Sequence, residues 1–328
     1  PVSASFPSTA ITTFIVNQNG GETNDALFSY AAGGSGQNDY LLFQSNNITT
    51  YRSNLNVASG VSANDGKWHI IDANWRSSDG DTRIWLDGTQ RFSTTFSTGI
   101  TINAGGCLAL AGEQDAIDGN YEAAQAHLGD YAEVLVYNIS LNQAQRIIVA
   151  NYLAAKYNIA MAGNDYFSYE STHSIDVAGI GQELGGTQTH TAAMSDGILQ
   201  VENPSGLNDQ EYLIFGHDAA DITTTWTATE TPAGGSIQRL AREWRFSETN
   251  GDVGTVDFLI DIATFPAIPV GFTKYALMVD SDGDFSTGAD VYEIGLVAGT
   301  EYDLTGINIA DGDFVALAVI DPEIEFTS

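Results

Sequence analysis

The chain has 328 residues, a length that predicts two domains, each with a core of its own. It carries 42 acidic residues against 11 basic ones, a formal net charge of −31, which argues against nucleic acid and anionic membrane surfaces as partners. Its one cysteine, Cys107, excludes an intramolecular disulfide, and no apolar run reaches the length of a membrane span. Because the chain starts at Pro1, we expect it to be a mature segment or a part of a longer protein.

The first half of the chain consists mainly of short β-type runs separated by clusters of Gly, Asn, Asp and Ser. The Asp87-Gly88 pair at the end of one run predicts a hairpin. The runs predict antiparallel strands over residues 26–31, 39–43, 68–75, 82–88, 107–112 and 131–138.

One helix is predicted after these strands, over residues 140–157. Ser140 and Gln143 have the spacing of a capping box. Apolar residues form one stripe along the helix: Leu141, Ala144, Ile148, Tyr152 and Ala155. We expect this helix to pack beside the first sheet structure and the next residues to form a boundary, so that the domains span 1–160 and 161–328.

The second half again predicts strands and no further long helix. In the run "GTVDFLIDI", the apolar residues Val256, Phe258 and Ile260 alternate with Asp257 and Asp261, which is typical of a strand with one buried face. This half also holds most of the acidic residues of the chain. The expected fold class is therefore all-β, with the second domain an acidic antiparallel β-sandwich.

The stretch "GEQDAIDGNYEAAQ", residues 112–125, crowds acidic and amide side chains between two predicted strands. Glu113 and Asp115 point the same way in an extended chain, and a glycine turn then lets Glu122 and Gln125 fold back over them. Hard cations such as calcium prefer several oxygen ligands in one place. The spacing alone leaves two interpretations open, a calcium cage or a solvated acidic loop.

This stretch resembles the calcium loop of the pentraxins. That loop has an EQD triplet, a glycine-rich turn, an acid, a glutamine, and a Gly-Asp pair before a strand. The sequence matches it without gaps at these residues: Glu113, Gln114, Asp115, Gly119, Glu122, Gln125, Gly129 and Asp130. Upstream, "QNDYLLF" and "GKWHIIDANWRSSDGDTRIWLDG" are similar to the core pattern of pentraxin and laminin-G domains, so the likeness covers about residues 25–140.

The resemblance implies a concanavalin-like jelly-roll sandwich with two calcium ions side by side on one face. Glu113 and Asp115 would bridge both ions, while two further pairs would each bind one ion. Carried over by position, the implied ligands are Asn38 and Asp39 for the inner ion, Glu122 and Gln125 for the outer ion, and the backbone carbonyl of Gln114. The order of Asn38 and Asp39 is reversed relative to the family.

The resemblance also implies where a ligand binds. Phosphate or hydroxyl oxygens of the ligand would complete the calcium coordination, and Phe43 falls where the family places an aromatic residue beside it. The loop after Phe43 has no match in the family, so ligand identity does not carry over. The tandem arrangement further resembles modules of secreted surface proteins of Bacteroidetes and marine bacteria. We therefore expect a bacterial adhesin, at the cell surface, that binds a glycan or a phosphoryl-bearing ligand through calcium.

A second acidic loop, "DSDGDFSTGADVYE", places Asp280, Asp282 and Asp284 at alternate positions, with Asp290 downstream. It resembles calcium loops of the Asp-x-Asp-x-Asp type, although the EF-hand positions are not filled. It is expected to be either a third calcium site or a solvated turn.

Two alternatives to a calcium-dependent adhesin remain open. The chain could be a structural stalk stabilised by calcium, or "EQDAID" could correspond to the paired carboxylates of a laminarinase-type glycosidase, with Asp118 as the third acid. We expect no enzyme. His217 and the other histidines lack zinc-ligand spacing. Arg242 and its neighbours Arg239 and Arg245 are expected to pair with local acids.

Overall fold

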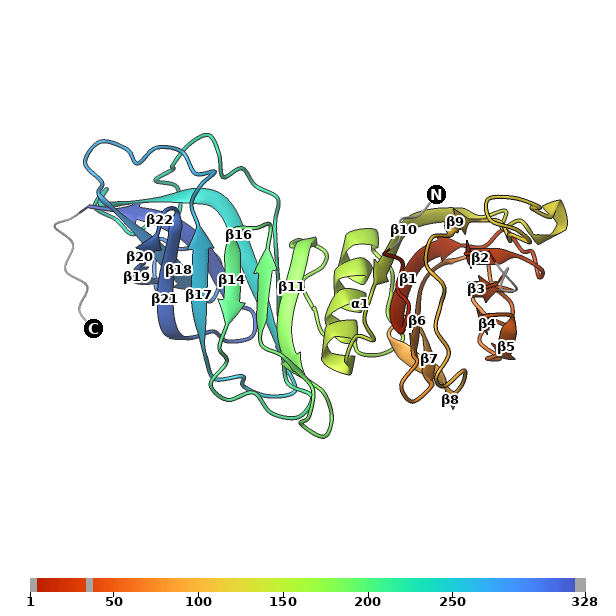
Figure 1. The fold of residues 1–328 in the computed structure, drawn as a ribbon. Helices are drawn as coiled ribbons and strands as arrows, with labels where there is room; N and C mark the ends of the chain where they lie inside the picture. Colours follow the sequence, from red (N-terminus) through yellow and green to blue (C-terminus); the bar gives the residue numbers. More distant parts are fainter. Residues whose placement is uncertain (1–4, 34–37, 322–328) are drawn as a thin grey trace. The chain divides into compact units, whose positions relative to one another are not determined.

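The computed structural model describes residues 5–33 and 38–321, and it shows an all-β chain with one α-helix in that part, as predicted (Figure 1). It divides into two compact units. The first comprises the residues up to Leu141 together with Ile159–Asn164, and the second comprises Asn142–Asn158 together with the residues from Asp165 on. Among the described residues, no helix has the length and apolarity that crossing a membrane would require.

The first unit is a sandwich of two five-stranded antiparallel sheets, the concanavalin-like jelly roll that the sequence predicts. One sheet has the order β10 (Asp130–Tyr137), β1 (Ala10–Gln18), β6 (Trp68–Arg76), β7 (Asp81–Leu86) and β8 (Thr89–Thr95). The other has the order β5 (Leu55–Ala58), β4 (Thr49–Arg52), β3 (Tyr40–Phe43), β2 (Ala26–Ala31) and β9 (Cys107–Leu110). The loop from β9 to β10 contains a short 3-10 helix, η1 (Ala123–Gln125).

Strand β3 shows how the second of these sheets uses both of its faces. Tyr40 and Leu42 lie in the core between the two sheets. Leu41 and Phe43 belong to a separate apolar cluster that includes Ala26 of β2. Because side chains alternate along a strand, this cluster lies on the face turned away from the core. The acidic loop between β9 and β10 starts from the other edge of β2.

The second unit is also a two-sheet sandwich, which confirms the second predicted domain fold (Figure 1). Its larger sheet has the order β12 (Thr189–His190), β11 (Ile175–Gln182), β15 (Tyr212–His217), β16 (Ile237–Thr249), β22 (Phe314–Ile320), β18 (Lys274–Asp280) and β19 (Asp290–Glu293). Its smaller sheet has the order β13 (Ala192–Ser195), β14 (Leu199–Glu202), β17 (Thr255–Asp261), β21 (Glu301–Asn308) and β20 (Gly295–Ala298). Val256, Phe258 and Ile260 of β17 are buried in the core, as their alternation predicts.

Helix α1 (Gln143–Tyr157) belongs to the second unit, whereas the sequence analysis expected it beside the first sheet structure. Ile147 and Ile148 belong to one apolar cluster with Val177 of β11 and Ile214 of β15. Figure 1 shows the helix beside β11. The apolar stripe thus finds its partner in the strands that follow the helix. The predicted domain boundary near residue 160 falls after this helix, whereas the helix itself groups with the second unit.

The helix begins two residues later than its predicted cap. Asn142 is the N-cap: its side chain accepts a hydrogen bond from the Gln145 backbone N–H at 2.8 Å, and the Gln145 side chain accepts one from the Asn142 N–H at 3.1 Å. This reciprocal pair is a capping box. The spacing of Ser140 and Gln143 fits the same pattern, but the hydrogen bonds form at Asn142 and Gln145.

Candidate metal centre

The acidic loop between β9 and β10 is braced at its start by Gln114, whose side chain is fully buried. Its amide nitrogen donates to the backbone oxygens of Ser29, at 3.2 Å, and Cys107, at 3.1 Å. Its amide oxygen accepts from the Asp118 N–H at 3.0 Å. With the side chain engaged in this way, only the backbone carbonyl of Gln114 is left for a metal, which is the role that the resemblance implies.

Glu113 lies at the centre of the loop's charged side chains. It is only 4% exposed and receives a hydrogen bond from the side chain of Asn38. Burial raises its pKa to about 7, and the negative charges of Asp115 and Glu122 add to the rise. The structure thus brings four of the predicted ligands together: Asn38, Glu113, Asp115 and Glu122.

Three oxygens of the predicted ligands are buried and accept no hydrogen bond: Oδ1 of Asn38, Oε2 of Glu113 and Oε1 of Gln125. The amide nitrogen of Gln125 donates to Glu122 Oε2 at 3.0 Å, so the oxygen is the end left unpaired. Leaving a buried acceptor unpaired costs about 1–3 kcal/mol. Carboxylate and amide oxygens are the ligands that calcium prefers, so these residues fit a bound calcium ion.

Asp39, the other residue of the predicted inner pair, does not join this group. Its carboxylate is fully buried and accepts from the Ala32 N–H at 2.9 Å and from the Asn103 side chain at 2.8 Å. Successive residues leading into a strand point to opposite sides, so only one of the pair reaches Glu113. The structure assigns that place to Asn38, and the expectation that Asp39 is a ligand is not supported.

Phe43 contributes less surface than the resemblance implies, because it is only 8% exposed. Its ring packs edge-on against Tyr51 of β4, with 6.3 Å between the ring centroids. Burial raises the pKa of Tyr51, and the charge of Glu113 raises it further, so this phenol lies near the acidic group. Sequence reasoning missed Tyr51 because its loop matched no family pattern. Tyr51 comes close to the acidic group because β4 pairs with β3, with Tyr51 opposite Leu41.

The far end of the loop is held by a buried hydrogen-bonded pair of side chains. His127 Nδ1 lies 2.8 Å from Asp25 Oδ2, and both side chains are fully inaccessible. The same carboxylate accepts from the Ser45 hydroxyl at 2.9 Å and from the Asn19 amide at 3.1 Å. This clamp fixes the chain two residues after Gln125. No sequence signal indicates it, because its two members are 102 positions apart.

The loop "DSDGD" of the second unit is a turn and not a gathered set of ligands. Oδ1 of Asp280 accepts from the backbone N–H groups of Asp282 and Gly283, both at 2.8 Å. Asp282 and Asp284 likewise accept from N–H groups two residues on. Asp290 lies on β19. Asp280, Asp282 and Asp284 each use one carboxylate oxygen for this turn. The third calcium site expected at Asp280, Asp282, Asp284 and Asp290 stays a prediction.

A different group in the second unit was not anticipated from the sequence. Asp176 of β11, Asp196 of the β13–β14 turn and His217 of β15 bring their ligand atoms within 4.8 Å of one another. Over residues 5–33 and 38–321 this is the one such group of three, since the acids of the first unit's loop stand further apart. Three separate elements supply it, which is why no zinc-type spacing marks it in the sequence.

The raised pKa of Glu113 predicts a pH-dependent stability for the calcium-free first unit. Between the ordinary value of 4.5 and the folded value of about 7, the folded chain retains a proton that the unfolded chain releases. The free energy of unfolding should therefore fall as the pH rises through this window. Urea unfolding in chelator across that range measures the effect. Glu113→Gln should remove the dependence and Asp118→Asn should keep it; an identical pH profile in Glu113→Gln would contradict the assignment.

The clamp predicts a stability loss when His127 is removed and the proposed calcium ligands are left intact. His127→Ala leaves the buried Asp25 carboxylate short of a donor, which should lower the free energy of unfolding of the first unit by about 1–3 kcal/mol. Proteolysis should also become faster within residues 112–128. Asp65→Ala, which removes a half-exposed partner of His69, should cost under about 1 kcal/mol. Equal, small losses in both variants would argue against the clamp.

Comparison with known proteins agrees with this fold. The chain is 35% identical over 82 residues to C-reactive protein 1.4 of Limulus polyphemus, which is 24% of this chain and 34% of that protein. It is 32% identical over 127 residues to neuronal pentraxin-2 of Mus musculus, 38% of this chain and 29% of that protein. The chain thus spans about a third of the length of these relatives.

Among solved structures, the heptameric SAP-like pentraxin from Limulus polyphemus aligns with a TM-score of 0.40 and 20% identity, covering 44% of this chain and 72% of that one. Residues 145–313 match a domain of unknown function, DUF8202. Residues 5–173 match the Pentaxin family. Since this match covers half of the chain, the chain belongs to the Pentaxin family.

Proposed function

We propose that the first unit binds calcium at the acidic loop and uses the bound ions to hold a glycan or a phosphoryl-bearing ligand. The proposed ligands are the side chains of Asn38, Glu113, Asp115, Glu122 and Gln125 and the backbone carbonyl of Gln114. The observation that carries the proposal is the set of three unpaired, buried oxygens on Asn38, Glu113 and Gln125. Acceptors without donors are stabilised by a cation and not by a further acidic or hydroxyl acceptor.

Calcium would reverse the local charge of a very acidic protein. With a net charge of −31, the chain offers few attractive positions to an anionic or hydroxyl-rich ligand. Two adjacent divalent ions supply positive charge together with coordination positions that protein oxygens leave open. Phosphoryl and sugar hydroxyl oxygens are suited to those positions.

Tyr51 and Phe43 supply an apolar side to the proposed ligand site. The Tyr51 ring lies near Glu113 and against Phe43, which is itself largely covered. An aromatic ring beside the ions can cover a sugar face or a quaternary ammonium group. We therefore assign the direct ligand contact to Tyr51 and a supporting role to Phe43.

We further propose that this protein binds its ligand without turning it over. In the alternative of a laminarinase-type hydrolase, Asp118 would be the third acid. Its backbone instead forms a left-handed turn, and its carboxylate accepts from the Tyr121 hydroxyl at 3.4 Å. A secreted bacterial adhesin at the cell surface remains our proposal for the biological setting, because an acidic, calcium-dependent module suits an extracellular medium.

Calorimetry with calcium tests the proposed centre directly. The wild-type chain should bind two ions with affinities in the roughly micromolar to millimolar range of extracellular sites. Glu113→Ala should weaken both ions, because this carboxylate is proposed to bridge them, whereas Glu122→Ala should weaken mainly one. Asp118→Asn is the matched control, an acid on the same loop outside the proposed set. Undiminished binding of two ions by Glu113→Ala would disprove the centre.

A glycan array and phosphocholine-coated beads, each probed in calcium and in chelator, test the ligand. Binding should require calcium, and Tyr51→Ala should weaken it while calcium affinity stays unchanged. If the chain binds calcium tightly but binds neither to the glycan array nor to the beads, the structural stalk is favoured. Cleavage of a β-glucan that persists in chelator would favour the hydrolase.

A further inference from the structure

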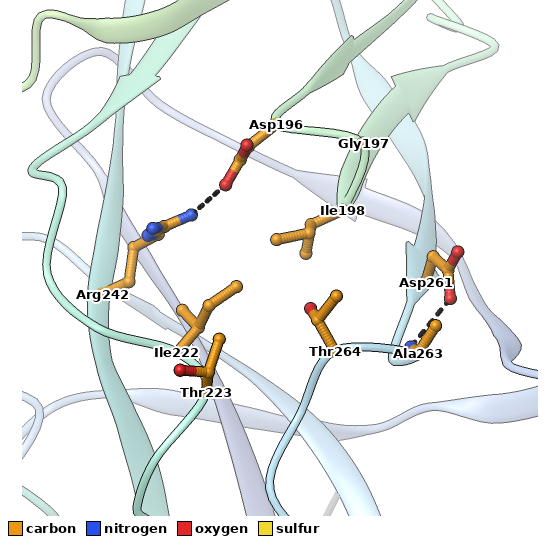
Figure 2. A pocket seen from close by; sticks show the side chains of 9 residues that line it. All are labelled: Asp196, Gly197, Ile198, Ile222, Thr223, Arg242, Asp261, Ala263 and Thr264. Atoms are coloured by element: carbon orange, nitrogen blue, oxygen red, sulfur yellow. Dashed lines mark hydrogen bonds and ion pairs between the residues drawn. The ribbon is translucent and has the colours of Figure 1, made fainter.

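The second unit contains a pocket of about 240 Å³ that is independent of the acidic loop. Four segments of the unit line it: the β13–β14 turn, the segment after β15, strand β16 and the end of β17 (Figure 2). The volume is below that of pockets for drug-sized molecules and suits a single small ring or side chain.

The lining combines an apolar surface with polar groups of both kinds. Ile198 and Ile222, each 4% exposed, belong to the core cluster of the unit. In Figure 2, Arg242 pairs with Asp196 on one side, Asp261 lies on the opposite side, and Thr264 lies between them, with Thr223 beside Ile222. A ligand in the pocket therefore meets donors, acceptors and hydrocarbon at once.

The polar groups are held in place by hydrogen bonds within the protein. Arg242 donates through Nε to the Ala220 carbonyl at 2.9 Å and through Nη1 to Asp196. Asp261 accepts from the Ala263 N–H at 2.9 Å through one oxygen. Nη2 of Arg242 and the second oxygen of Asp261 have no hydrogen-bond partner in the described part of the chain. Groups that are fixed beforehand lose little entropy when a ligand binds.

The adjoining group of Asp176, Asp196 and His217 argues against a metal at this end of the unit. His217 Nδ1 accepts a hydrogen bond from the Ala219 N–H at 3.0 Å, so the neutral ring carries its proton on Nε2. A metal at Nε2 would need the lone pair that this proton occupies. Burial lowers the pKa of His217, and the nearby Arg242 lowers it further, so the ring is neutral at neutral pH.

The same tautomer leaves a buried donor unsatisfied. Nε2 of His217 has no hydrogen-bond partner, and it lies 3.7 Å from Asp176 Oδ2 and 4.0 Å from Asp196 Oδ2. These separations are too long for direct hydrogen bonds and suit one intervening oxygen that accepts from Nε2 and donates to a carboxylate. A hydroxyl group or a water molecule meets both requirements.

The chemistry of the lining selects among ligand classes. Two carboxylates and one guanidinium leave a surplus negative charge, which disfavours an anion. An ammonium group gives the unpaired Nη2 of Arg242 nothing to donate to. An apolar ligand would leave both this Nη2 and the second oxygen of Asp261 unpaired. A hydroxyl group both accepts and donates, so it can pair with Arg242 and with Asp261.

We propose that this pocket binds a neutral sugar residue by direct hydrogen bonds, without calcium. Its hydroxyls accept from Arg242 and donate to Asp261 and the threonines, and its C–H face lies on Ile198 and Ile222. The site is separate from the calcium-dependent one of the first unit and stands whether or not that one holds.

Methyl NMR of the full chain, labelled at isoleucine δ1 carbons and kept in chelator, tests this inference. The probes are glucose, galactose, mannose, N-acetylglucosamine and arabinose. At least one should shift the Ile198 and Ile222 signals saturably, while Ile15 and Ile71 of the first unit stay in place. Asp261→Asn keeps the acceptor for Ala263 but loses the charge, and it should weaken binding about tenfold.

Thr264→Val, which removes an exposed hydroxyl, should also weaken binding, and the isoleucine spectrum itself reports whether each variant is folded. Asp303→Asn, the same change on β21 outside the pocket, should leave the affinity unaltered. The inference is overturned if none of the five sugars shifts Ile198 and Ile222, or if Asp261→Asn binds as tightly as wild type. It is equally overturned if methylamine or inorganic phosphate produces the shifts and the sugars do not.

Discussion

A buried carboxylate beside two further carboxylates is the constraint on which the first unit's site depends. Glu113 is nearly inaccessible, its Oε2 accepts no hydrogen bond, and its pKa rises to about 7. An isolated group of this kind destabilises a fold in its charged form. In the function that we propose, a bound cation offsets that cost and then attracts an anionic or hydroxylated ligand.

Such a group keeps its geometry only if the loop around it is rigid. Gln114 braces the start of the loop through Ser29 and Cys107, and the His127–Asp25 pair closes its end. Both braces are buried hydrogen-bond networks, which fix backbone position more firmly than exposed pairs do. The residues that we propose as calcium ligands therefore lie on a stretch of backbone that is fixed at both ends.

The two units differ in whether their clustered acidic side chains have basic partners. In the first, no basic partner is seen for Glu113, Asp115 or Glu122 of the acidic loop among the described residues, and we propose a metal as their partner. In the second, Arg242 compensates Asp196, and Arg239 pairs with Glu243 at 2.9 Å. These two arginines pair with local acids, as predicted, whereas Arg245 lies over the rings of Tyr169 and Phe314. Compensated acids are free to act as hydrogen-bond acceptors toward a neutral ligand.

The sequence by itself determined the all-β class, the jelly roll and the core of the acidic loop, because strand alternation and the EQD spacing are local patterns. Gly129 of that pattern has a local reason too, since a Cβ there would lie 1.9 Å from the Gln18 carbonyl oxygen. Only the tertiary structure decided which of Asn38 and Asp39 faces Glu113, that Tyr51 approaches it, and which sheet the helix covers. The clamp and the pocket of the second unit also depend on residues far apart in sequence. Such contacts arise from strand pairing and sheet packing, which no local pattern encodes.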